Sequence, residues 1–150
     1  MAKSKSCRCC GSKKKCNGAH VYVIELESEI IADSKFRKKT GISEDFIGRC
    51  FYVDQTSAHR VECRFKQHRA KKSTRRRGKP FPCTCKNGKP VDIPYNWSNG
   101  GNSFVRKYAK GLAYELFSHL NPLPKKYEPK VAEAALAESL RSQGFAVHYN

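Results

Sequence analysis

The chain has 150 residues, which is enough for one domain with a modest hydrophobic core. Its 30 basic and 13 acidic residues give a formal net charge of +17 at neutral pH. No segment has the apolar length of a membrane span or the pattern of a membrane-surface helix, so we expect no membrane partner.

Two tracts without acidic residues carry the whole charge excess. Residues 1–24 contain six basic side chains and residues 63–91 contain eleven, whereas the remaining chain holds 13 basic and 13 acidic residues. Positive charge concentrated in this way attracts a polyanion, so we expect nucleic acid as the partner. The alternatives are an anionic membrane surface and a solvated basic tail without a partner.

The first half of the chain predicts an arm and two strands. Residues 1–18 are rich in Lys, Ser, Cys and Gly, a composition that cannot bury a core by itself. The domain that follows covers residues 19–150. His20–Leu26 and Cys50–Thr56 are rich in β-branched and aromatic residues, which is typical of buried strands.

A helix is predicted directly after the second strand. Ser57 can cap it, and the basic run near Lys71 should end it. On this helix Val61, Phe65 and His68 share one face at three- and four-residue steps.

Residues 70–100 have the composition of a basic insertion that contains Cys and a turn signal at Asn87-Gly88. Nucleic-acid phosphates are expected to bind at the end of the preceding helix and in this insertion, through Arg69, Lys71, Lys72, Arg75, Arg76, Arg77 and Lys79.

The C-terminal third predicts further elements. A short helix is expected at 103–110, and the alternation from Leu112 to Leu120 predicts a third strand. Pro129 suits the first turn of a last helix, which Gly144 should end. Residues 145–149 are expected to form a terminal strand or strap.

The eight cysteines are interpreted from the expected compartment. No apolar run follows the charged N-terminus, so we expect a cytoplasmic protein with reduced thiols. Structural Zn2+ or free thiols both fit such cysteines, and a zinc site would draw its ligands from Cys7, Cys9, Cys10, Cys16, Cys83 and Cys85. Cys50 and Cys63 are expected to fill small spaces in the core.

The order of tyrosine-bearing strands and the helix carrying Arg64 and His68 resembles the GIY-YIG nuclease domain. Val21-Tyr22 stands for the end of the first motif, and Tyr52-Val53-Asp54 stands for the second. The likeness covers about residues 19–150, with the insertion. Within that superfamily the chain is similar to one small bacterial branch. It implies an α+β fold with a small central sheet of about three main strands, mixed or antiparallel, flanked by helices.

The resemblance also implies roles for single residues. Tyr22 and Tyr52, with His68, would orient or deprotonate water, and Arg64 would hold the phosphate. The competing interpretation makes the tyrosines core aromatics, Arg64 part of an exposed basic face and His68 a partly buried core histidine.

Glu133 is the expected ligand for Mg2+ or Mn2+. It aligns with Leu136 and Leu140 on the last helix, beside the buried stripe, whereas Glu138 lies at the far edge. A single carboxylate suffices for Mg2+ when water and substrate phosphate complete its shell.

Asp54 is the departure from the pattern, because the second motif of the family has glycine at this position. The carboxylate either points into the site and helps to hold the metal, or points away and merely ends the strand.

The sequence therefore predicts a metal-dependent endonuclease that cleaves nucleic acid, with DNA favoured over RNA. One alternative is a non-catalytic, zinc-stapled nucleic-acid-binding module on the same fold. Another is a zinc-stabilised ribosome- or RNA-associated protein whose strand motifs match those of the family by chance.

Overall fold

The computed structural model describes residues 19–56, 61–69, 80–83, 91–94, 103–124 and 126–149. In chain order the elements are β1 (His20–Leu26), α1 (Ser34–Thr40), β2 (Cys50–Thr56), α2 (Val61–Arg69), β3 (Pro80–Cys83), β4 (Val91–Pro94), α3 (Ser103–Tyr108), β5 (Ala109–Leu112), α4 (Pro129–Ser142) and β6 (Ala146–Tyr149). Short 3-10 helices lie at Ser28–Ala32, Tyr114–Leu116 and Ser118–Leu120.

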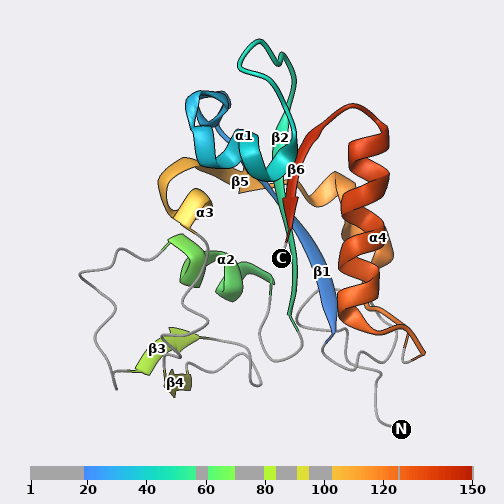
Figure 1. The fold of residues 1–150 in the computed structure, drawn as a ribbon. Coiled ribbons are helices and arrows are strands. Elements are labelled where there is room, and N and C mark those ends of the chain that lie inside the picture. The colour runs from blue at the N-terminus through green and yellow to red at the C-terminus, as the bar shows by residue number, and fades with distance from the viewer. Residues whose placement is uncertain are drawn as a thin grey trace, which may run out of the picture.

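A mixed sheet in the order β5-β1-β2-β6 forms the centre of the fold (Figure 1). β1 runs antiparallel to both β2 and β5, whereas β6 lies parallel to β2. The predicted α+β class is confirmed. The sheet has four strands rather than about three, because the terminal segment pairs with the free edge of β2. A separate antiparallel pair, β3 and β4, lies within the basic insertion.

The pairing register decides which side chains share a face of the sheet. Tyr22 pairs with Asp54, and His148 pairs with Tyr52. Directly paired residues point to the same face, and Tyr52 and Asp54 are two residues apart on one strand. All four side chains therefore project from one face of the sheet.

The helices cover the two faces of this sheet unequally. Figure 1 shows α1, α2 and α3 on one side and α4 on the other. On the first side Phe36 and Phe104 meet edge to face with ring centroids 5.6 Å apart, a favourable aromatic geometry. On the second side α4 buries Ala137 and Leu140. Both layers belong to one continuous core.

The strand predicted over Leu112–Leu120 is wrong, because β5 ends at Leu112 and two 3-10 turns follow it. The edge of β1 has another partner at this level. The side chain of Asn121 accepts from the Val21 N–H at 3.0 Å and donates to the Val21 carbonyl at 2.8 Å. One amide side chain thus satisfies the backbone groups that a longer β5 would have paired.

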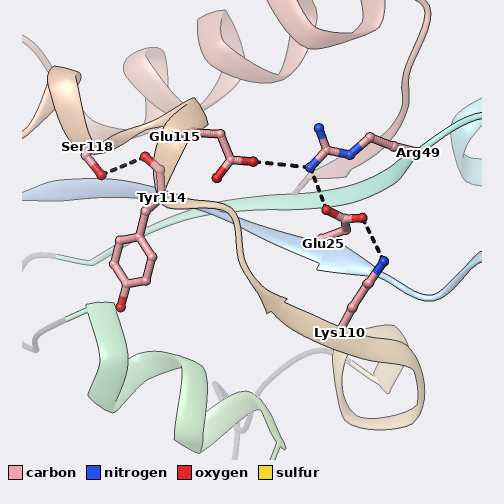
Figure 2. A network of polar contacts seen from close by, with 6 residues as sticks. All are labelled: Glu25, Arg49, Lys110, Tyr114, Glu115 and Ser118. Atoms are coloured by element: carbon pink, nitrogen blue, oxygen red, sulfur yellow. Dashed lines mark hydrogen bonds and ion pairs between the residues drawn. The ribbon is translucent and has the colours of Figure 1, made fainter.

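A polar network ties the sheet to the 3-10 turns at its surface (Figure 2). Arg49 lies between the carboxylates of Glu25 and Glu115, at 2.6 Å and 3.2 Å, and Lys110 contacts Glu25 at 3.5 Å. The bond from Arg49 lowers the pKa of Glu25. Exposed ion pairs contribute little singly, so this network mainly fixes the position of the turn.

Replacing Asn121 with alanine should lower the free energy of unfolding by about 2 kcal/mol, because two hydrogen bonds to buried backbone are lost. Urea unfolding followed by circular dichroism measures this change. Gln143→Ala is the matched control, since the Gln143 amide donates to Ser139 at an exposed site. Equal stability of the two variants would show that Asn121 does not hold the edge of β1.

Candidate active site

A buried carboxylate stands at the centre of the candidate site. Oδ2 of Asp54 accepts a hydrogen bond from the Tyr52 hydroxyl at 2.9 Å and one from the Tyr22 hydroxyl at 3.3 Å. Nε2 of His68 lies 3.5 Å from the same oxygen. The other carboxylate oxygen accepts from the Gln55 backbone N–H at 2.8 Å. Asp54 therefore points into the site. The sequence had left the orientation of this carboxylate open.

His68 reaches this cluster from α2. Its ring is buried, and Nε2 lies 2.7 Å from the Tyr22 hydroxyl. When Nε2 carries a proton, it can donate to the Tyr22 oxygen while the Tyr22 proton points at Asp54. The first turn of α2 is also held by the 3-10 helix at Tyr114–Leu116, because the Tyr114 hydroxyl donates to Glu62 at 2.9 Å.

Arg64 lies one turn before His68 on α2 and is partly buried. Its positive charge lowers the pKa of both Tyr22 and Tyr52, although other effects on these phenols are larger. Arg64 is therefore within electrostatic reach of both phenols.

Glu133 approaches from α4, the helix on the other side of the sheet. It is almost completely buried, and its charge raises the pKa of Tyr52. Glu138 instead is exposed and holds Arg141 at 2.9 Å and the Tyr149 hydroxyl at 3.1 Å. Burial and proximity to the cluster thus distinguish the two acids in favour of Glu133.

The two tyrosines act as neutral donors in this arrangement. Burial, followed by the charge of Asp54, raises the pKa of both Tyr22 and Tyr52 above the ordinary tyrosine value. A tyrosinate is therefore strongly disfavoured while Asp54 is charged and bonded to the phenols.

Asp54 itself stays ionised. Burial raises its pKa, but the bonds from His68, the Gln55 backbone and Tyr52 together outweigh burial, so the net shift is downward. A carboxylate that accepts several hydrogen bonds is stabilised in its charged form. A negative charge thus occupies the centre of the cluster at neutral pH.

The sequence did not single out His148 as part of the site. Its buried ring lies 5.7 Å from the Tyr52 ring and 5.4 Å from the Phe104 ring, measured between centroids. Burial, with the charges of Lys39 and Arg141, lowers its pKa to about 4. The ring is therefore neutral at pH 7 and packs against the cluster.

Several predicted residues lie outside the described part of the chain. These are the phosphate-binding residues Lys71, Lys72, Arg75, Arg76, Arg77 and Lys79 and the zinc candidates Cys7, Cys9, Cys10, Cys16 and Cys85. The backbone of Cys83 lies in β3, but its side chain is not described. Arg69 is exposed, with its guanidinium 5.4 Å from the centre of the Phe65 ring.

Comparison with models of protein families, with curated proteins and with solved structures found no match for this chain. Within the described ranges, no group of three or more His, Cys, Asp or Glu side chains is placed to hold a metal ion. None of the helices in these ranges is long and apolar enough to cross a membrane.

The raised pKa values predict that Tyr22 and Tyr52 do not titrate near pH ~10 in the folded protein. Phenolate absorbance, measured during alkaline titration, should therefore be the same for the wild type, Tyr22→Phe and Tyr52→Phe before unfolding begins. In denaturant each variant should lose one titrating phenol.

The same shifts give the direction of alkaline stability. Above pH ~10 only the unfolded chain releases the two protons, so the free energy of unfolding should fall as pH rises. A native titration in which either variant loses a phenolate near pH ~10 would contradict the buried cluster.

Proposed function

We propose that this protein is an endonuclease that hydrolyses phosphodiester bonds of nucleic acid with a divalent metal, DNA being favoured over RNA. One observation carries the proposal: two tyrosine hydroxyls and an imidazole converge on one point beneath a helix whose Arg64 acts on both phenols. The net charge of +17 supports a polyanionic substrate.

The donors at this point suit a phosphodiester. Arg64 can hold two phosphate oxygens through its guanidinium and stabilise the charge that builds during displacement. The Tyr22 and Tyr52 hydroxyls can donate to an anionic oxygen or orient a water molecule. Once Tyr22 no longer donates to Asp54, His68 in the tautomer with an unprotonated Nε2 can accept a proton through the Tyr22 hydroxyl, which lies 2.7 Å away.

Glu133 fits the metal that such a reaction uses. Mg2+ and Mn2+ prefer oxygen ligands, and a buried carboxylate beside Tyr52 offers one, leaving the remaining positions for water and substrate phosphate. When bound, the cation polarises a phosphoryl oxygen and neutralises developing charge. The chain's own residues then bind, orient and exchange protons around it.

Membership of the GIY-YIG superfamily belongs to this proposal. Its support is the order Tyr22, Tyr52, Arg64, His68 and Glu133 along the chain, together with the burial of all of these except the half-buried Arg64. β1, the first tyrosine-bearing strand, also lies between two antiparallel neighbours, β5 and β2.

Glu133→Ala should abolish cleavage of DNA in the presence of Mg2+ or Mn2+ while leaving DNA binding intact, because it removes a metal ligand and no phosphate contact. Glu138→Ala on the same helix is the matched control and should cut like the wild type. Gel assays of nicking, with binding measured by fluorescence anisotropy, provide both readouts.

Two results would contradict this assignment. Cleavage by Glu133→Ala together with loss of cleavage in Glu138→Ala would exchange the roles of the two acids. If the wild type binds DNA and RNA but cuts neither, the chain is a nucleic-acid-binding module.

A further inference from the structure

Asp54 occupies the point toward which the donors of the site are directed. The hydroxyls of Tyr52 and Tyr22 and Nε2 of His68 lie at 2.9, 3.3 and 3.5 Å from one carboxylate oxygen. Two phenols and an imidazole around one negatively charged oxygen form an anion-binding arrangement. The anion that fills it belongs to the protein itself.

The carboxylate is also the most exposed of the four side chains that meet at this point. Tyr22, Tyr52 and His68 are at most 1% exposed, whereas Asp54 is 8% exposed. Asp54 is therefore the member of the cluster closest to the surface. A substrate oxygen cannot meet the two hydroxyls while Oδ2 holds their hydrogen bonds, because each phenol has one proton to donate.

Asp54 lies beyond the β2–β6 ladder but is paired with Tyr22 of β1, so displacement of the carboxylate involves its side chain and not the backbone. The last pair of that ladder joins Val53 to Tyr149, one residue before Asp54. Glycine, the residue of the resembling motif, would leave the donors of this point open to an incoming anion. In this chain the same space is filled by a carboxylate.

We propose that Asp54 is a built-in occupant of an oxyanion site, which holds the site closed until a phosphate oxygen displaces the carboxylate. The inference rests on the proposed function for the nature of the anion, a phosphodiester. It adds that the chain carries its own competitor for that anion. No covalent step is involved, because one anion exchanges for another on the same donors.

Binding of inorganic phosphate to the full chain tests the occupancy directly. Asp54→Ala should bind phosphate at least about tenfold more tightly than the wild type. If Asp54 leaves the wild-type site open in less than about a tenth of the molecules, the apparent phosphate affinity is reduced by the same fraction. Isothermal titration calorimetry measures the affinity. Phosphate should also raise the melting temperature of Asp54→Ala more than that of the wild type.

Three further variants separate occupancy from other effects. Asp54→Asn removes the charge but keeps the space filled, so it should gain much less phosphate affinity than Asp54→Ala. Adding Tyr52→Phe to Asp54→Ala removes one donor and should reverse the gain. Asp33→Ala also removes a carboxylate that accepts hydrogen bonds, at the start of α1, and should gain no phosphate affinity.

If the alanine variant does not fold, the phosphate affinity of Asp54→Ser provides the same test. Serine is shorter than aspartate, carries no charge and still offers an acceptor to a phenol. Equal phosphate affinity of the wild type, Asp54→Ala and Asp54→Ser would overturn the inference. So would DNA cleavage that is lost in these variants without a gain in phosphate affinity, because Asp54 would then be a working group.

The cleavage assay distinguishes this inference from the proposed function. If both hold, Asp54→Ala binds phosphate more tightly and cuts DNA several-fold faster. If phosphate affinity rises but no form of the protein cuts nucleic acid, the self-occupied anion site stands and the nuclease proposal fails.

Discussion

The burial of a charged carboxylate at Asp54 is the constraint on which the rest of this structure depends. An unpaired charge in a protein interior is very costly, so it must be surrounded by donors. The Tyr22 hydroxyl comes from the neighbouring strand, the Tyr52 hydroxyl from the same strand and the imidazole of His68 from α2. The strand register and the position of α2 over the sheet are therefore coupled through one oxygen atom.

The local charge of the candidate site is opposite in sign to the net charge of the chain, which is +17. The sequence carries a large excess of Lys and Arg, but the centre of the candidate site contains Asp54, with Glu133 near Tyr52. A polyanionic substrate, as proposed above, would meet negative charge at the cluster. A divalent cation at Glu133 and displacement of Asp54 would together reverse this local charge. The two proposals are linked in this sense.

The strands that carry the site could be predicted from sequence because their signal is local. β1 and β2 have the predicted bounds, since their runs of β-branched and aromatic residues are continuous. The orientation of Asp54 was left open by the sequence analysis, and the structure places its side chain on the same face as that of Tyr52, two residues before it. The alternation from Leu112 to Leu120 led to a wrongly predicted strand. Asn121 bonds to the Val21 backbone at this edge of β1, and no local pattern indicates that contact.

Other parts of the site depend on distant pairing. His148 joins Tyr52 only because β6 adds in parallel to the edge of β2, and a single strand does not indicate its neighbour. Glu133 was selected by its place beside the apolar stripe of the last helix, and it is indeed buried. That α4 covers the opposite face of the sheet from α2 could not be inferred from that stripe.

Cleavage kinetics of paired tyrosine variants provide the most direct test of the central claim that the cluster around Asp54 is a catalytic centre. Single-turnover cleavage of labelled DNA should be slowed about a hundredfold in Tyr52→Phe, the effect expected for loss of one donor. Tyr149→Phe, altered one strand away at a hydroxyl bonded to Glu138, should cut like the wild type. Equal rates for the two variants would contradict the account.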